Sequence, residues 1–172
     1  MAKLTSDVAD TICRTVELAV TITGAAVDGA DRTHGWCRVL QADPNCPGCG
    51  LAGRLRDHAD RILTDLPISG HPVLLHLAVP RFVCGNSQCP RTIYRGRIDH
   101  IAPVRSVVTT RTARWILQRI SVDKMSVKAV ASGLGLAWKT VNQIALDSAR
   151  ALVYDGGRLP ATHRRLRAPE PP

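Results

Sequence analysis

The chain has 172 residues, which is enough for one domain or two small ones. No apolar run approaches the roughly 20 residues that span a bilayer, and residues 1–10 lack the apolar core of a secretory signal. We therefore expect a cytoplasmic protein. Residues 1–90 carry 8 Lys/Arg against 9 Asp/Glu, whereas residues 91–172 carry 15 against 5. A basic excess confined to the second half indicates a polyanionic partner there, most simply nucleic acid.

The first 40 residues predict one helix and a hairpin. A short helix capped by Ser6 is expected over residues 5–13. Apolar side chains then alternate over residues 16–27, which is the period of a strand. A turn at residues 28–31 would lead into a second strand over residues 35–40.

Two cysteine knuckles stand in the middle of the chain. Cys46 and Cys49 form the first, and Cys84 and Cys89 the second. The residues between them read as two strands, 54–66 and 72–84, joined by a bend at Ser69-Gly70. Four thiolates in two knuckles are enough for a closed tetrahedral Zn²⁺ site. The sequence therefore predicts a zinc ribbon whose ligands are these four cysteines.

Other uses of the cysteines stay open at this point. Two disulfides could use the same four residues, but a cytosolic chain with this spacing favours a metal. Iron in a four-sulfur site is the main rival, because the ligand set alone does not exclude it. Cys13 and Cys37 stand alone in apolar surroundings, and we expect both to fill the core.

The second half changes to a helical period. Residues 91–97 continue extended, and residues 99–108 read as a linker. Apolar residues then fall three and four apart from Thr109, which predicts a helix capped by Thr109 or Thr110. Ser126 would cap a second helix, Gly135 would end it, and residues 137–152 predict a third.

The last two predicted helices have the spacing of a helix-turn-helix. Gly135 suits the tight turn, because a positive φ is cheap only for glycine. The third helix would then enter the major groove of DNA. The candidate DNA contacts are polar or basic residues on or before this helix: Trp138, Lys139, Thr140, Asn142, Gln143, Arg111 and Arg114. The alternative is a plain three-helix bundle whose polar face is only solvated.

These observations predict an α+β chain with two modules. A small β-rich zinc-ribbon-like domain is expected over residues 1–98, followed by a linker over residues 99–108. A three-helix helix-turn-helix domain is expected over residues 109–158, and a disordered tail over residues 159–172.

With both elements in place, the chain resembles the N-terminal half of an IS-L-three family transposase. The resembling segments are residues 46–50, 65–73, 81–84 with Asn86, 89–91 and 134–141, within a match over residues 12–158. The resemblance implies zinc at the four cysteines and a helix-turn-helix that binds the terminal inverted repeats of a transposon. The expected partner is double-stranded DNA, the expected location is the bacterial nucleoid, and a homodimer is left open.

The end of the sequence departs from the family. Family members continue into a catalytic domain with an Asp/Asp/Glu triad for two-metal chemistry, whereas this sequence has no Asp after Asp155. We therefore expect DNA binding by a truncated, non-enzymatic relative of a transposase. The alternative is the DNA-binding part of an active transposase, completed by a frameshifted product or a partner chain. An iron-containing electron carrier is a weaker alternative.

Overall fold

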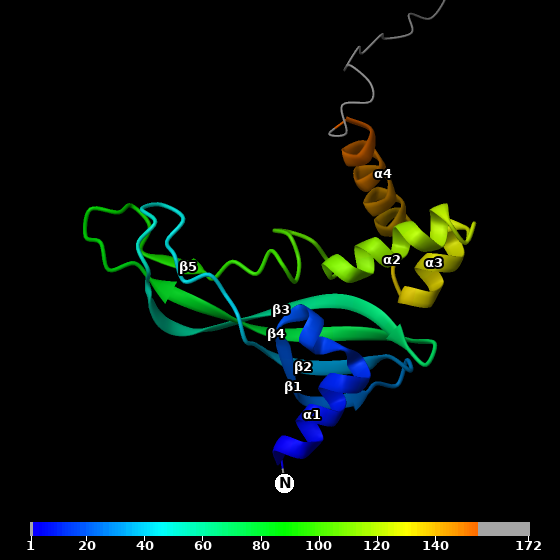
Figure 1. The fold of residues 1–172 in the computed structure, drawn as a ribbon, viewed down its shortest axis with the longest axis horizontal. Coiled ribbons are helices and arrows are strands. Elements are labelled where there is room, and N and C mark those ends of the chain that lie inside the picture. The colour runs from blue at the N-terminus through cyan, green and yellow to red at the C-terminus, as the bar shows by residue number, and fades with distance from the viewer. Residues whose placement is uncertain (1, 155–172) are drawn as a thin grey trace, which may run out of the picture.

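The computed structural model describes residues 2–154 (Figure 1). Within that range, four α-helices and a five-stranded sheet form a mixed α+β fold, as predicted. The elements in chain order are α1 (Ala2–Cys13), the 3-10 helix η1 (Thr15–Leu18), β1 (Val20–Val27), β2 (Thr33–Val39), β3 (Arg54–Ile68), β4 (His71–Val83), β5 (Ile93–Arg95), α2 (Thr110–Ser121), α3 (Val127–Leu134) and α4 (Trp138–Tyr154). No helix in this part of the chain is long and apolar enough to cross a membrane. The predicted disordered tail, residues 159–172, lies outside the described residues.

Two antiparallel hairpins make up most of the sheet. The strand order is β1-β2-β4-β3, with β5 paired to β4. The strands β1 and β2 form one hairpin, the long strands β3 and β4 form the other, and β2 joins them by running parallel to β4. The predicted strands over residues 54–66 and 72–84 are thus confirmed, since their apolar alternation buries one face of the pleat.

The predicted strand over residues 16–27 begins later than expected. Residues 15–18 form η1 instead, with Thr15 and Leu18 buried and Val16 73% exposed. Burial three residues apart is the period of a 3-10 turn, not of a strand. The extended chain begins only after Ala19, whose φ of 51° interrupts the backbone. The extended segment predicted over residues 91–97 shortens to β5.

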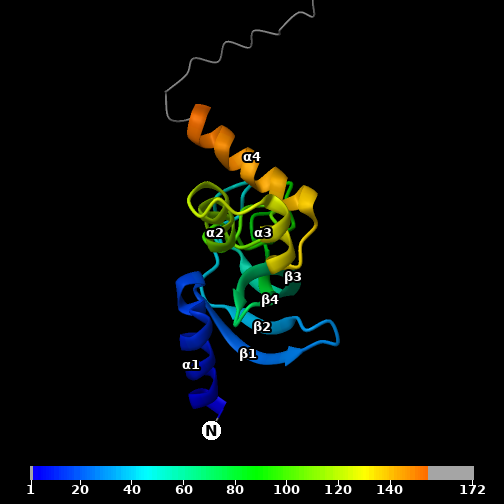
Figure 2. The ribbon, with the colours of Figure 1, turned by 90° about the vertical axis from the view of Figure 1, so that its right-hand side faces the viewer.

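One face of the sheet carries the larger core. The buried members of this core are Leu18, Val20, Ile22, Cys37, Leu63, Val73, Leu75, Leu77, Val79, Ile98, Ile101 and Ala102. Helix α1 lies beside β1 (Figure 2) and packs Ala9 and Cys13 against this cluster. Ile101 and Ala102 come from the segment expected to be a linker, so that segment is packed here. The division into domains stays a prediction.

The helices α2, α3 and α4 have a separate small core. It consists of Ile116, Val130, Ala131, Leu134 and Val141. The Thr109 hydroxyl accepts a hydrogen bond from the Thr112 N–H (3.2 Å), and Ser126 does the same for Ala129 (3.2 Å). The N-caps predicted at Thr109 and Ser126 are therefore confirmed, and each satisfies a helix donor that would otherwise lack a partner. The cap predicted at Ser6 is wrong, because α1 already begins at Ala2 and the Ser6 hydroxyl donates to the Ile22 carbonyl (2.9 Å).

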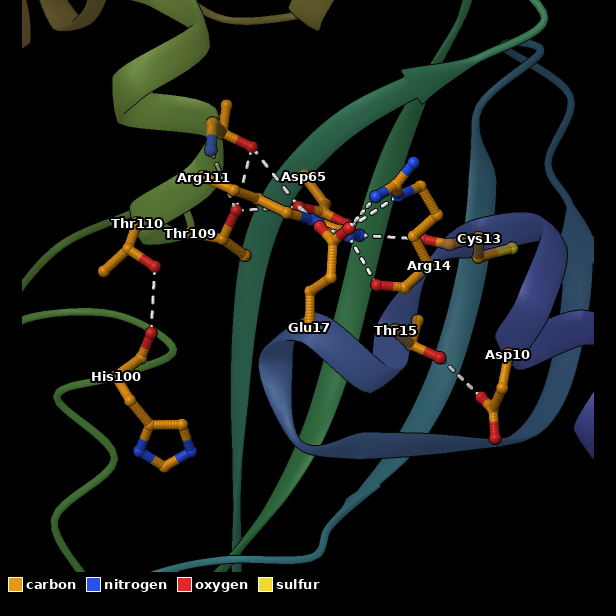
Figure 3. A network of polar contacts seen from close by, with 11 residues as sticks. Asp10, Cys13, Arg14, Thr15, Glu17, Asp65, His100, Thr109, Thr110 and Arg111 are labelled. Atoms are coloured by element: carbon orange, nitrogen blue, oxygen red, sulfur yellow. Dashed lines mark hydrogen bonds and ion pairs between the residues drawn. The ribbon is translucent and has the colours of Figure 1, made fainter.

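A buried ion pair joins these helices to the sheet (Figure 3). Arg111 on α2 donates from Nε to Oδ1 of Asp65 on β3 (2.9 Å), and its Nη2 reaches the other carboxylate oxygen. The two side chains are 11% and 3% exposed. Burial lowers the pKa of Arg111, but hydrogen bonds and attraction from the Asp65 carboxylate outweigh it and leave that pKa raised.

The same pair also holds the N-terminal elements and the start of α2. Arg111 donates to the carbonyl oxygens of Arg14 (2.7 Å) and Cys13 (3.0 Å), at the end of α1. The Thr109 hydroxyl donates to Oδ1 of Asp65 (2.7 Å). Strand β3, helix α2 and the α1–η1 junction therefore meet at one ion pair.

We predict that Asp65→Asn destabilises the fold strongly. Removing one partner of a buried pair leaves an uncompensated buried charge, which costs about 3–5 kcal/mol. Urea unfolding would measure the change in free energy. Asp60→Asn, on an exposed position of the same strand, is the matched control and should stay within about 0.5 kcal/mol. Equal losses in both variants would contradict this role for Asp65.

Candidate metal centre

The two cysteine knuckles lie together at the end of the β3–β4 hairpin far from α2–α4 (Figure 1). The first knuckle precedes β3 and is closed by the Cys46 N–H, which donates to the Leu51 carbonyl (2.8 Å). The second follows β4, where the Cys84 N–H donates to the Thr92 carbonyl (2.9 Å). Because β3 and β4 are paired, their ends bring the two knuckles face to face.

The four sulfur atoms are arranged as a tetrahedral metal requires. The Sγ atoms of Cys46, Cys49, Cys84 and Cys89 all lie within 4.8 Å of one another. The Cys46–Cys89 distance is 3.8 Å and the Cys49–Cys84 distance is 3.6 Å. Sulfurs about 2.3 Å from a central zinc, at the corners of a tetrahedron, lie about 3.8 Å apart. All four thiols are free, so the set fits a closed four-sulfur site and not two disulfides.

Gly48 allows the two knuckles to approach this closely. A Cβ atom added to Gly48 would lie 3.1 Å from the Sγ of Cys89 and 3.8 Å from that of Cys46. A larger residue would push into the space between the sulfurs. The glycine of the first knuckle therefore serves the spacing of the ligands as well as the turn.

The protons on the four thiols have to be displaced together. Burial raises the pKa of Cys46, but N–H groups of Gly48 and Cys49 donate to its sulfur and bring the pKa down to about 7. The N–H of Asn86 lowers the pKa of Cys84, yet burial and the neighbouring thiols raise it to about 12. Four thiolates this close need a cation to be ionised together at neutral pH, so metal binding would release protons.

Few apolar residues support this end of the hairpin. The buried cluster beside the cysteines consists of Cys46, Phe82 and Tyr94. The two rings stack with centroids 5.8 Å apart, and the Tyr94 hydroxyl donates to the Pro44 carbonyl (2.5 Å). This ring pair was not predicted from the sequence. The available signal was position: aromatic residues make up only 3% of the chain, and these two lie on either side of the second knuckle. A core this small depends on the metal for stability.

The geometry defines a zinc ribbon: two knuckles at the ends of paired strands with four sulfurs around one point. Residues 42–89 match the family described as the zinc-finger of transposase IS204/IS1001/IS1096/IS1165. The predicted resemblance to IS-L-three transposases is confirmed for this segment, and zinc is the cofactor that the family and the four cysteines support. No curated protein and no solved structure matches the chain.

The two remaining cysteines lie away from this centre. Cys37 is 3% exposed in the larger core, and Cys13 packs against the same core. Burial raises the pKa of Cys37 to about 12, so its thiol stays protonated. Both therefore fill the core, as predicted.

The structure places most of the predicted DNA contacts on the surface of α4. Trp138 is 54% exposed, and Lys139 and Gln143 are also exposed, whereas Thr140 and Asn142 are half-buried. Arg114 is exposed on α2. Their contact with DNA stays a prediction.

Arg111 requires a correction. Its guanidinium is 11% exposed and donates to Asp65 and to two carbonyl oxygens of the N-terminal segment. A guanidinium whose N–H groups donate to these acceptors has few donors left to bind a phosphate. We therefore assign Arg111 a structural role and remove it from the candidate DNA contacts.

We predict that Cys84→Ser releases zinc, because a serine hydroxyl is a poor replacement for a thiolate ligand. Zinc content per chain, measured by atomic emission, should fall from one to near zero. Loss of structural zinc in small domains removes roughly 10 kcal/mol or more of folding free energy, so the knuckles should also lose protection from proteolysis.

Cys37→Ala is the matched control, since that cysteine is buried outside the cluster. It should keep one zinc per chain. Stoichiometric zinc in purified Cys84→Ser protein would refute the ligand assignment.

Proposed function

We propose that this chain is a zinc-dependent, sequence-directed DNA-binding protein that recognises transposon ends. The observation that carries the proposal is the arrangement of α3 and α4, joined by a short turn after Gly135 and presenting an exposed polar surface on α4. The transposase zinc finger matched by residues 42–89 supports the same partner.

Local features of the α3–α4 pair support the proposal of a helix-turn-helix. Gly135 ends α3 with a φ of 63°, and α4 begins three residues later at Trp138. Val130, Ala131 and Val141 are at most 3% exposed between the helices. A small residue at 131 allows close packing, and a glycine turn of this length is typical of the motif.

The surface of α4 offers suitable chemistry for reading bases. Lys139 can reach guanine or phosphate, and the amides of Asn142 and Gln143 can pair with adenine. The Gln143 amide now donates to Asp147 on the next turn (2.8 Å), a contact that it would exchange for a base. Residues 91–172 carry the basic excess of the chain, which favours a polyanion at these helices.

The family of the zinc finger favours a second candidate function. In this alternative the chain is the DNA-binding part of an active transposase, completed by a frameshifted product or a partner chain. A binding-site selection with the purified chain, followed by a strand-cleavage assay on the selected duplex with Mg²⁺, separates the two. Binding without cleavage supports the first function, and cleavage only after a partner product is added supports the second.

We predict that Asn142→Ala relaxes sequence preference. Loss of a bidentate base contact costs about 1–3 kcal/mol at the preferred site, and non-specific binding should barely change. Lys139→Ala should instead weaken binding evenly across sequences if the ammonium contacts phosphate. Fluorescence anisotropy with the selected and a scrambled duplex measures both effects.

Gln41→Ala, which removes an exposed amide remote from α4, is the control. Unchanged preference in Asn142→Ala and unchanged affinity in Lys139→Ala would together argue against α4 as the recognition helix.

A further inference from the structure

A tight turn before α2 displays Arg105 at its tip. The Ser106 N–H donates to the Pro103 carbonyl (3.1 Å), which closes the turn over residues 103–106. Arg105 has a φ of 66°, in the left-handed region that glycine usually occupies at this turn position. A bulky basic residue pays a conformational penalty there, and such strain concentrates at functional sites.

The turn is held rigidly by a second arginine. Arg61 on β3 donates from Nη2 to the carbonyl oxygens of Pro103 (2.7 Å) and Ser106 (3.0 Å). On the far side of the turn, the Val107 carbonyl accepts a hydrogen bond from the Thr64 N–H (2.9 Å). The position of Arg105 is therefore fixed relative to the sheet.

The side chain of Arg105 is free for an external ligand. Within residues 2–154, its guanidinium makes no hydrogen bond or ion pair, and the residue is exposed. The other basic residues with positive φ differ in this respect. Arg14 pairs with Glu17, and the Lys124 ammonium donates to the Ser121 carbonyl (2.6 Å).

Arg105 and residues of α4 line one groove of about 810 Å³. Lys139 and Gln143 lie on the α4 side of this groove, and the apolar residues Ala113 and Ile144 also line it. Asp147 lines the groove too. Its carboxylate lies 3.4 Å from the Arg150 guanidinium and accepts a hydrogen bond from the Gln143 amide. The lining of the groove thus combines the two basic side chains of Arg105 and Lys139 with apolar residues.

We propose that Arg105 binds the sugar–phosphate backbone of the same duplex that α4 reads, with one DNA strand lying in this groove. The inference rests on the proposed DNA-binding function. Phosphates suit the two basic side chains, and deoxyribose rings suit the apolar residues of the lining. Contacts of this kind position a protein on DNA without reading its sequence. Arg105 would thereby fix the orientation of α4 in the major groove.

Arg105→Gly tests the proposal without endangering the fold. Glycine tolerates the left-handed conformation, so the melting temperature should stay equal or rise. The slope of log K against log salt is negative, and each lost phosphate contact reduces its magnitude by about 0.9. The ratio of wild-type to variant affinity should therefore shrink about 3.5-fold between 50 and 200 mM salt. Affinity for selected and scrambled duplexes should fall by the same factor.

Three further variants sharpen the result. Arg105→Asn also accepts the left-handed backbone and should reproduce the glycine result. Arg105→Lys keeps the charge and should retain the wild-type slope. Arg38→Ala removes an equal charge from an exposed position on β2 and should also retain it.

A wild-type slope in both Arg105→Gly and Arg105→Asn would overturn the proposal. If Asn142→Ala still relaxed sequence preference in that case, the proposed function would stand without it. A wild-type chain that fails to bind any duplex would overturn both.

Discussion

The ion pair between Asp65 and Arg111 is the contact on which the arrangement of the molecule depends. The carboxylate belongs to the long hairpin, and the guanidinium to the first of the three C-terminal helices. Separate cores serve the sheet and the helices, so apolar packing within either part does not set their relative orientation. A buried charge pair favours one orientation, because few geometries satisfy both groups. The backbone hydrogen bonds that join Thr64 to Val107 and Thr109 support the same orientation. The N-terminal helix is included through the Cys13 and Arg14 carbonyls.

The sequence allowed the secondary structure to be predicted well wherever burial follows a regular period. The alternation along β3 and β4 and the caps at Thr109 and Ser126 were readable because each is a local property. Residues 16–18 were wrongly assigned to a strand, since three residues of a 3-10 turn beside a strand can show the same apolar alternation. The packing of Ile101 in the larger core was not foreseen either, because it depends on contacts distant in the sequence.

The candidate site residues also divide into those that local sequence predicts and those that depend on contacts distant in the sequence. Knuckle spacing was enough to identify the four cysteines, because metal ligands close together in sequence are close in space. The role of Arg111 could not be predicted from sequence. A basic residue near a helix start suits DNA or a buried carboxylate equally, and Asp65 is 46 residues away. The proposed role of Arg105 could not be predicted for another reason. It depends on a left-handed backbone conformation that arginine seldom adopts.

The long strand β3 separates the metal centre from the C-terminal helices. The strand begins at Arg54 beside the metal centre and reaches Asp65, where the helices are attached. Eleven residues of fully extended chain span at most about 36 Å, and β3 is shortened by its curvature (Figure 1) and by an irregularity between Leu55 and Asp57. The hairpin thus holds the zinc ribbon and the helices at its two ends (Figure 1). A partner that contacts both the zinc ribbon and the helices must therefore extend along the length of the hairpin.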